Sequence, residues 1–420
     1  MTSVNERTIL NIVNPICCGL DVHKESVTAC ILFNDAKGKE RTIIKEFSTF
    51  TDSLFELRDW LLDNDCPIVA MESTGVYWHP VHNILEGYVS VILVNARDIK
   101  NVPGRKTDIK DSEWLAGLLR HGLLRSSFIP PKYVREWRDL TRLRRNYVNS
   151  VSDFKKRVQK LLESSNIKID SVVSDIFGVT GRNLLTLLAS GHTNITMTDI
   201  ENCVRGKLKC KQQELYRSIK GFFTEHHGFM LNTLLSTIET LENKIASLEQ
   251  KIAESMSGYK ELLERIKEVP GISDFSAMDI IAELGTTLDA FENEAALVSW
   301  CGLCPGNNES AGKRQKGKNR TRKNQLKPVM VEVGWAASRT KNTYYHDKYQ
   351  QLRTRLGHNK AVVAIAHRIM KGLYHIIKNG VSYKDLGMDY LDKKTKTSKL
   401  YRLQKQAESL GFKMIPISEI

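Results

Sequence analysis

Residues 106–121 read KTDIKDSEWLAGLLRH, a stretch that places two carboxylates at the start of a helical pattern. Asp108 and Asp111 are three residues apart, so at about 3.6 residues per turn both would project from one helix face. The apolar positions that follow keep the same spacing: Trp114, Leu115, Leu118 and Leu119. A divalent cation between the carboxylates would relieve their repulsion. An acidic first turn with Thr107 as N-cap is the alternative, which the helix dipole favours, and this stretch alone leaves both interpretations open.

Upstream of this stretch, short β-rich segments alternate with helical ones. The expected strands are residues 16–22, 26–34, 40–47, 68–73 and 89–95, and the expected helices lie near 52–63 and between the last two strands. Three consecutive strands followed by helix–strand alternation predict a mixed α/β sheet.

Two acids fall within or at the end of apolar strands. Asp21 interrupts the first strand and Glu72 ends the fourth. A carboxylate in such a place is costly unless it is paired or binds a metal ion. Asp21, Glu72, Asp108 and Asp111 can then meet at one edge of the sheet. An all-oxygen ligand set suits Mg²⁺, or Mn²⁺, rather than zinc, and such a site supports phosphoryl transfer.

Composition narrows the class of protein. The 420 residues carry a formal net charge of +14, which favours a polyanionic partner such as nucleic acid. No apolar run of about 18 residues predicts a membrane span, and the N-terminus lacks a signal-peptide pattern. The eight scattered cysteines read as reduced thiols, and Cys301-x-x-Cys304 lacks a second ligand pair for zinc. We expect a cytoplasmic protein without a membrane partner.

The residues around the four acids resemble a known family. The segments GLDVHKES (19–26), AMESTGVYW (70–78) and VNARDIKNVPGRKTDIKDSEWLAGLLRHGLL (94–124) resemble the DEDD-type, RuvC-like domain of the bridge-RNA-guided recombinases, a group of bacterial insertion-sequence transposases. The resemblance covers nearly the whole of this first domain. It implies a ribonuclease-H-like fold in which Asp21, Glu72, Asp108 and Asp111 bind Mg²⁺.

A basic amphipathic helix is expected over residues 135–162. Its polar face is either simply solvated or, in a chain this positive, in contact with a phosphate backbone. The family resemblance implies phosphates of RNA as well as DNA. The candidate nucleic-acid contacts here and just before Asp108 are Arg105, Lys106, Arg138, Arg142, Arg144, Arg145, Lys155, Lys156 and Arg157.

A heptad seam follows. Its apolar positions alternate spacings of four and three: Leu234, Ile238, Leu241, Ile245, Leu248 and Ile252. This pattern predicts either a coiled coil between protomers, which we favour, or a long helix packed on its own domain. We therefore expect a homodimer or tetramer.

The C-terminal region begins with a turn between two helices, VPGISDFSAMDIIAELG (269–285). It resembles a helix-hairpin-helix, whose backbone N–H groups can bind phosphate. Ser273 stands in place of the usual second glycine, so the alternative, a turn with a structural role alone, stays open. Residues 328–376 have a helical pattern, with Trp335, Tyr344, Tyr345 and His367 expected in the core. The remaining residues read as a mobile polar tail.

A basic loop lies between these helices. GLCPGNNESAGK (302–313) resembles the family's GLxPxxxxSxGK-like segment, which implies that Ser310 attacks the scissile phosphate and forms a covalent phosphoserine–DNA intermediate. Ala311 replaces a common glycine, and NQLK (324–327) departs from the family pattern. The candidate nucleic-acid contacts in this loop are Lys313, Arg314, Lys316, Lys318, Arg320, Arg322 and Lys323.

These observations predict an α/β domain followed by all-α regions: a RuvC-like DEDD domain (1–130), a helical linker with basic helix and coiled coil (131–266), a serine-bearing transposase domain (267–380) and a basic tail (381–420). The resemblance implies a transposase that cuts and rejoins donor and target DNA, guided by an element-encoded noncoding RNA. The alternative enzyme is a RuvC-like Holliday-junction resolvase or metal-dependent nuclease that uses activated water. The third possibility is a non-enzymatic nucleic-acid scaffold.

Overall fold

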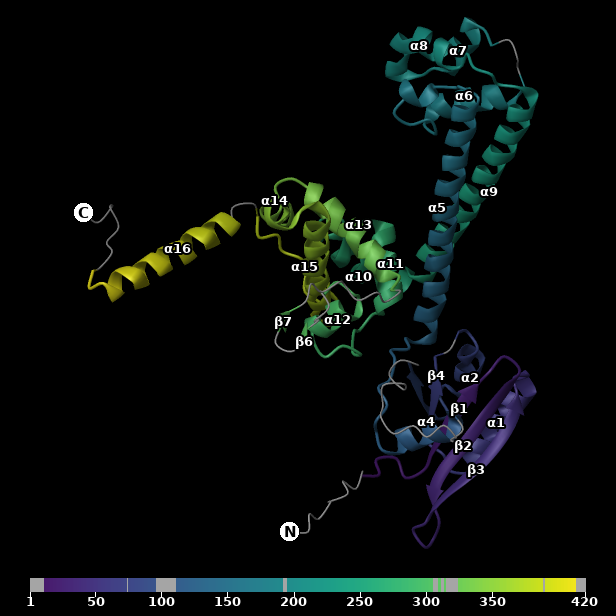
Figure 1. Ribbon diagram of the computed structural model, residues 1–420, viewed down its shortest axis with the longest axis vertical. Coiled ribbons are helices and arrows are strands. Elements are labelled where there is room, and N and C mark those ends of the chain that lie inside the picture. Colours follow the sequence, from purple (N-terminus) through teal and green to yellow (C-terminus); the bar gives the residue numbers. More distant parts are fainter. Residues whose placement is uncertain are drawn as a thin grey trace. The chain divides into compact units, whose positions relative to one another are not determined.

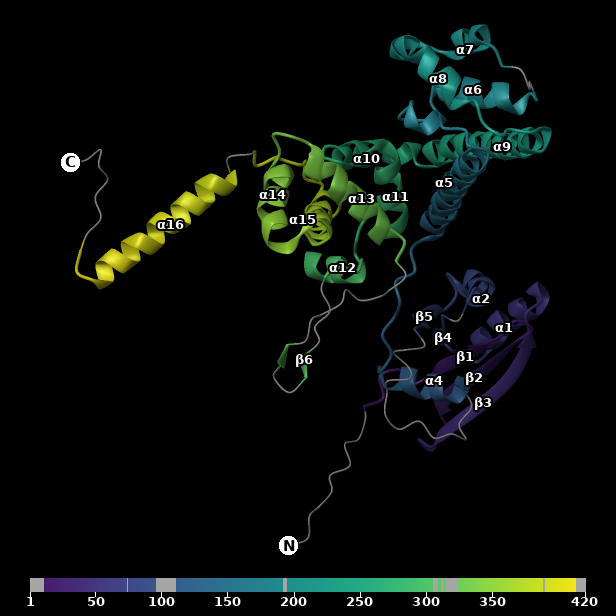
Figure 2. The same cartoon turned by 45° about the horizontal axis from the view of Figure 1, so that its top comes forward.

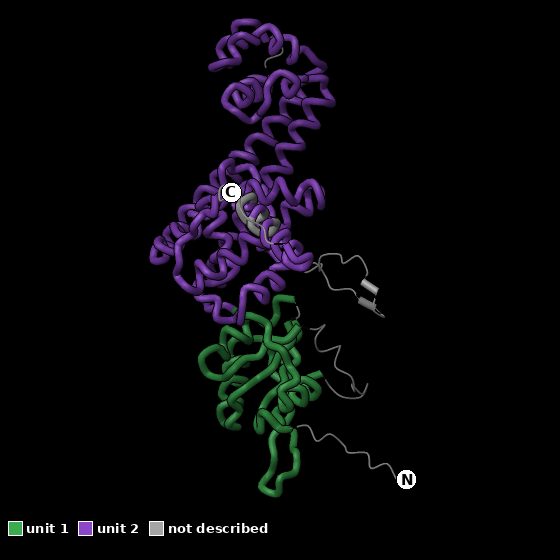
Figure 3. The backbone as a smooth tube through the Cα atoms, turned by 90° about the vertical axis from the view of Figure 1, so that its left-hand side faces the viewer, with its two compact units in different colours: residues 1–129 green, residues 130–420 purple. Residues whose placement is uncertain are grey.

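The computed structural model describes residues 11–73, 75–95, 111–191, 195–304, 309–310, 313–314, 324–387 and 390–412. The chain divides into two compact units, Met1–Ile129 and Pro130–Ile420 (Figure 3). The finer division of the second unit at residues 266 and 380 stays a prediction. Across the residues described, no helix combines the length and apolar character needed to span a membrane.

The first unit is a mixed five-stranded sheet covered by helices (Figure 1). The strand order is β3-β2-β1-β4-β5; β1, β2 and β3 pair antiparallel, whereas β1, β4 and β5 run parallel. This is the predicted ribonuclease-H-like arrangement, so the predicted fold class is confirmed. Its elements are β1 (Cys17–Val22), β2 (Ser26–Asn34), β3 (Glu40–Ser48), α1 (Thr51–Asp63), β4 (Ile68–Glu72), α2 (Trp78–Leu85), β5 (Ser90–Val94) and α4 (Asp111–Arg120).

Side-chain alternation along the strands gives the sheet two apolar faces. Cys18 and Leu20 of β1 pack with α1 and α2 in one core. Cys17 of β1 and Ala70 of β4 pack with α4 in another. The apolar pattern predicted for the helix after Asp111 is confirmed, because Leu115, Leu118 and Leu119 are buried.

The second unit is helical and has two apolar cores. One core is formed by α5 and α9, which lie side by side, together with the short helices at their ends (Figure 1). The other is formed mainly by α10 to α15, which cluster in both ribbon views (Figure 2). The helices are α5 (Lys132–Ser164), α6 (Val179–Ala189), α7 (Met197–Cys203), α8 (Gln212–Ser218), α9 (Glu225–Ser255), α10 (Lys260–Lys267), α11 (Asp274–Leu284), α12 (Glu294–Trp300), α13 (Leu326–Arg339), α14 (Tyr344–Leu356), α15 (His358–Asn379) and α16 (Tyr390–Ser409).

The heptad seam of α9 packs within its own chain. Ile238 is buried in the core that also contains Val151 and Val158 of α5, and Leu241 and Ile245 pack against that core. The structure thus agrees with the alternative of a long helix packed on its own domain. The seam gives no support for association between protomers, and the predicted homodimer or tetramer stays a prediction.

The turn between α10 and α11 is built into the packing. Gly271 has φ +89°, and a Cβ there would lie 2.5 Å from the backbone nitrogen of Ala337 in α13. Ser273 is the N-cap of α11, and its side chain accepts a hydrogen bond from the backbone N–H of Ser276. Both observations favour the structural role left open for this turn.

One expectation about the C-terminal region needs correction. Trp335, expected in the core, is 45% exposed, whereas Tyr345 is buried as expected. The tail contains the 20-residue helix α16, and its mobility stays a prediction. Its lysine-rich sequence has few helix breakers, and Tyr390 makes an edge-on ring contact with Tyr344.

Candidate active site

Two of the predicted carboxylates occupy neighbouring positions on adjacent parallel strands. Leu20 of β1 is in register with Met71 of β4, so the next residues, Asp21 and Glu72, follow side by side at the same end of the sheet. Side chains two residues apart on a strand point to the same face of the sheet, so Asp21 shares a face with Cys17 and Glu72 with Ala70. The side chains of Cys17 and Ala70 lie in the core beneath α4. The register therefore brings Asp21 and Glu72 to the sheet face that α4 covers.

The third carboxylate comes to this end of the sheet because α4 runs antiparallel to β1. The Cys17 thiol donates to the carbonyl oxygen of Ala116 at 3.4 Å. A Cβ added to Gly19 would lie 2.1 Å from the carbonyl oxygen of Ser112. Moving along β1 toward Asp21 therefore means moving back along α4 toward Asp111, its first residue. Only glycine at position 19 permits this backbone approach.

A buried arginine fixes the other end of α4. Arg120 is 1% exposed, and its guanidinium donates to the carbonyl oxygen of Pro15 at 3.0 Å and to the side-chain oxygen of Asn34. These bonds tie the last turn of α4 to the segment before β1 and to the end of β2. Arg120 is not among the site residues predicted from the sequence. The signal that could have revealed it is its position directly after Leu118 and Leu119, within the apolar pattern of the helix.

The chemistry of the three acids fits a divalent cation, since carboxylate oxygens are the ligands that Mg²⁺ prefers. Within the described ranges, no three His, Cys, Asp or Glu side chains are grouped closely enough to hold a metal ion. The Asp21 carboxylate instead accepts from the His23 ring at 3.2 Å. Asp108, the fourth predicted ligand, lies outside the described residues. The backbone thus gathers Asp21, Glu72 and Asp111 at one edge without a closed ligand set.

Ser310, the candidate nucleophile, belongs to a two-stranded hairpin. β6 (Glu309–Ser310) pairs antiparallel with β7 (Lys313–Arg314), and Ser310 is opposite Lys313. Ser310 is thus the last residue of its strand, and only residues 311–312 separate it from Lys313. The backbone of the predicted basic loop is described at these four positions. The remaining candidates of this loop, Lys316, Lys318, Arg320, Arg322 and Lys323, lie outside the described residues, as do Arg105 and Lys106.

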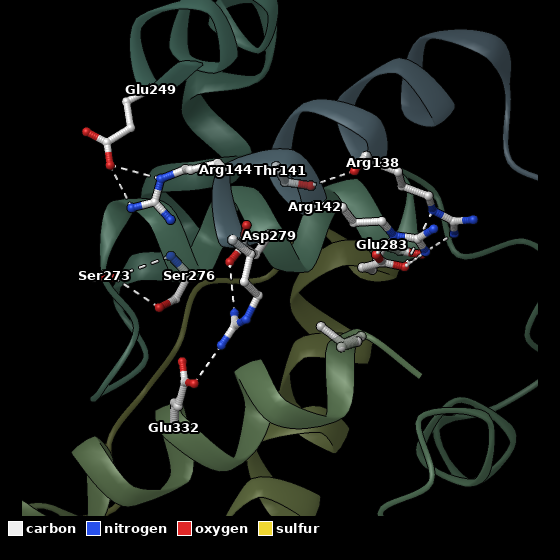
Figure 4. A network of polar contacts seen from close by, with 12 residues as sticks. Arg138, Thr141, Arg142, Arg144, Glu249, Ser273, Ser276, Asp279, Glu283 and Glu332 are labelled. Atoms are coloured by element: carbon white, nitrogen blue, oxygen red, sulfur yellow. Dashed lines mark hydrogen bonds and ion pairs between the residues drawn. The ribbon is translucent and has the colours of Figure 1, made fainter. Parts of the chain in front are cut away.

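The predicted nucleic-acid contacts in the first half of α5 have partners within the chain (Figure 4). Arg142 donates to both carboxylate oxygens of Glu283, at 2.7 and 2.9 Å. Arg138 donates to the carbonyl oxygens of Ala282 and Glu283 at the end of α11. These bonds fasten α5 to α11, and a guanidinium so engaged is less available to a phosphate.

The next arginines of α5 are held in the same way. Arg144 donates to Glu249 of α9, and its guanidinium lies 4.0 Å from the ring centre of Phe275. Arg145 pairs with Asp279 at 3.4 Å and with Glu332 at 2.6 Å. The basic face of this part of α5 is therefore largely an internal interface.

The predicted nucleic-acid contacts in the second half of α5 make weaker interactions within the chain. Lys155 pairs with Glu242 at 3.4 Å and Lys156 with Asp153 at 3.0 Å. Arg157 lies over the ring of Phe154. Ion pairs near the protein surface are weak, so Lys155 and Lys156 can exchange theirs for phosphate, and Arg157 is itself exposed.

Two buried acids that were not predicted from the sequence, Asp279 and Glu283, explain this interface. Both are buried on α11, and burial raises the pKa of Asp279 to about 6. Burial also lowers the pKa of Arg138 to about 10. The available signal was a pair of acids four residues apart in the apolar segment DFSAMDIIAEL, because buried carboxylates at that spacing require cationic partners on a facing helix.

Comparison with known protein families finds two matches. A model described as "Transposase", for DEDD transposases of the IS110 group, matches residues 18–167. A model described as "Transposase IS116/IS110/IS902 family" matches residues 263–350. A comparison with curated proteins gave no significant match. The first match contains Asp21, Glu72, Asp108 and Asp111, and the second contains Ser310.

Proposed function

Because the chain belongs to the IS116/IS110/IS902 family of transposases, enzymes that act on DNA, we propose that it cuts and rejoins DNA with an acidic tetrad and a serine nucleophile. The tetrad is Asp21, Glu72, Asp108 and Asp111, and the nucleophile is Ser310. The observation that carries this proposal is the register of β1 and β4, which aligns Asp21 with Glu72 on the face where α4 begins.

In this proposal the four carboxylates hold a divalent cation, Mg²⁺ or Mn²⁺. When bound, the cation supplies Lewis-acid polarisation of the scissile phosphate and offsets the negative charge that develops in phosphoryl transfer. The contribution of the chain is to position the acids. Gly19 lets α4 lie directly on β1, and Arg120 anchors the far end of the helix, so Asp111 is carried by a rigid element.

Ser310 performs the covalent step. Its hydroxyl oxygen forms a bond to phosphorus, the phosphorus–oxygen bond to one deoxyribose breaks, and the hydroxyl proton ends on the departing deoxyribose oxygen. A hydroxyl from another DNA end reverses these changes, so strands are rejoined without an external energy source. Lys313, paired with Ser310 in the hairpin, brings a cationic residue next to the reacting phosphate.

The partners in this proposal are donor DNA, target DNA and an element-encoded noncoding RNA. The net charge of +14 supports a polyanionic assembly, and pairing between RNA and DNA would set sequence choice. The acids and the serine are proposed to come from different protomers of a homodimer or tetramer.

Trapping the intermediate tests the covalent step. Wild-type protein incubated with element-end DNA, guide RNA and Mg²⁺ and then denatured should carry DNA on Ser310, identified by peptide mass. Ser310→Ala should form no adduct and no recombinant product, whereas Ser236→Ala, a change on the exposed side of α9, should retain both.

The alternative enzyme, a RuvC-like resolvase or nuclease that uses activated water, predicts a different pattern. Ser310→Ala would then still cleave DNA, while Asp21→Asn would not. A scaffold without catalytic activity predicts that Asp21→Asn retains full function. The match of residues 263–350 to a transposase family favours the serine mechanism over both.

A further inference from the structure

A pocket of about 450 Å³ lies between the end of α13, one side of α14 and the start of α15. Its volume is within the range of sites that bind small organic molecules. It belongs to the second unit and shares no residue with the proposed tetrad or with the basic loop around Ser310.

An exposed aromatic platform forms one side of this pocket. Trp335 is 45% exposed, and the guanidinium of Arg339 lies 4.1 Å from the centre of its ring. The opposite side of α13 is buried, since Val333 and Ala337 are core residues. An exposed tryptophan with an arginine stacked on it is a flat surface of the kind on which nucleobases stack.

The cations of the pocket differ from those of α5 in their partners. The arginines in the first half of α5 are paired with carboxylates. Among the described residues, neither Arg339 nor Arg353 makes an ion pair, and none of the described residues that line the pocket is acidic. Both guanidinium groups are therefore available to a phosphate next to the aromatic platform.

Hydrogen bonds hold the remaining walls in place. The His346 ring donates from Nδ1 to the carbonyl oxygen of Ser338 at 2.8 Å. The hydroxyl of Tyr349, a largely buried residue, lies 2.6 Å from Nδ1 of His358, whose ring makes an edge contact with Trp335. The pocket thus has fixed polar walls and needs little ordering to accept a planar ligand.

We propose that this pocket binds an unpaired nucleotide of a single nucleic-acid strand. The base stacks on the platform of Trp335 and Arg339, and Arg353 contacts the flanking phosphate. A base within a duplex cannot offer its face to this platform, so the site selects unpaired strands. The DNA strands opened during recombination and a guide RNA are both sources of such a nucleotide.

The test measures binding, not cleavage, and so does not depend on the proposed serine mechanism. The full-length protein in EDTA is titrated into labelled oligothymidylate and, separately, labelled oligouridylate, with a duplex of the same length as competitor. Trp335→Ala should weaken binding of the preferred single strand by about tenfold, and Trp335→Phe should lie between. Arg353→Ala should lower the salt slope of binding by about 0.7. Tighter binding of oligouridylate would identify RNA as the source, tighter binding of oligothymidylate would identify DNA, and equal binding would show that the pocket accepts a nucleotide of either strand.

Two controls isolate the pocket. Arg355→Ala removes an exposed cation from α14 that does not line the pocket, and Phe222→Ala removes an aromatic side chain that is 81% exposed elsewhere. Both should bind like wild type. The proposal is overturned if Trp335→Ala, with an unchanged unfolding curve, binds both single strands like wild type. It is also overturned if Trp335→Ala weakens competition by the duplex as much as it weakens binding of the single strand.

Discussion

Replacing Gly19 with alanine tests the contact that places Asp111 near Asp21. The new Cβ would lie 2.1 Å from the carbonyl oxygen of Ser112 and 2.5 Å from the backbone nitrogen of Ala116. Both are backbone atoms of α4, so relief requires the helix to move by about 1 Å, since carbon and oxygen or nitrogen normally approach no closer than about 3 Å. Overpacking of this kind costs about 1–3 kcal/mol.

A second glycine provides the matched control. Gly117 lies within α4, and a Cβ there would meet nothing within 4 Å. Gly117→Ala should therefore stabilise the helix by about 0.5–1 kcal/mol. Urea unfolding gives the free energies, and hydrogen exchange of the peptide containing β1 reports local opening.

The two variants should also differ in DNA cleavage. Gly19→Ala should reduce cleavage because the start of α4 is displaced from the sheet, and Gly117→Ala should retain it. If Gly19→Ala were as stable and as slow in hydrogen exchange as wild type, the close packing of α4 on β1 would be refuted, and with it the route by which Asp111 reaches the sheet edge.

Three further perturbations concern the second unit. Arg142→Ala leaves the buried carboxylate of Glu283 without its bidentate partner and should lower the free energy of unfolding by about 3 kcal/mol. The control, Arg157→Ala on the exposed side of the same helix, should change it by less than about 0.5 kcal/mol. Equal effects of the two variants in urea unfolding would contradict the internal interface. Burial raises the pKa of Asp279 to about 6, above the unfolded value near 3.9. Between about pH 4 and pH 6 the folded chain therefore retains a proton that the unfolded chain releases, so the free energy of unfolding should fall as the pH rises through this range. Asp279→Asn should flatten that fall in unfolding curves measured across this range, and an unaltered pH profile would count against it. Gly271→Ala combines a positive φ with a Cβ 2.5 Å from a backbone nitrogen of α13 and should lower the free energy of unfolding by more than about 2 kcal/mol. In the control, Gly258→Ala, the added Cβ meets nothing within 4 Å, so thermal unfolding should be nearly unchanged.

The fold of the first unit was predictable because its signals are local. β-rich runs separated by turn residues predicted β1 to β3, and apolar runs that follow helical segments predicted β4 and β5. What the sequence could not supply was the direction of α4 across the sheet. That direction depends on Gly19, whose missing side chain carries no hydrophobic signal, and on Arg120, which looks like an ordinary helix-ending arginine.

The partners of the basic residues on α5 could not be predicted from the sequence, for a physical reason. A basic helix face has the same sequence pattern whether it meets phosphates or carboxylates of a neighbouring helix. In α5 the facing acids come from α9, α11 and α13, more than a hundred residues away. The heptad seam was ambiguous in the same way, because its pattern does not say which helix covers it. Trp335 was expected in the core because hydrophobicity alone does not indicate the exposed side of α13.

The most direct test of the central claim locates the cation on the polypeptide. Fe²⁺ is substituted for Mg²⁺, and hydroxyl radicals generated with ascorbate and peroxide cleave the backbone near the bound ion. The fragments should end near Asp21, Glu72 and Asp111, and these cuts should disappear in Asp21→Asn and in the presence of excess Mg²⁺. Cuts confined to other parts of the chain, or cuts at these positions that persist in Asp21→Asn, would contradict the account.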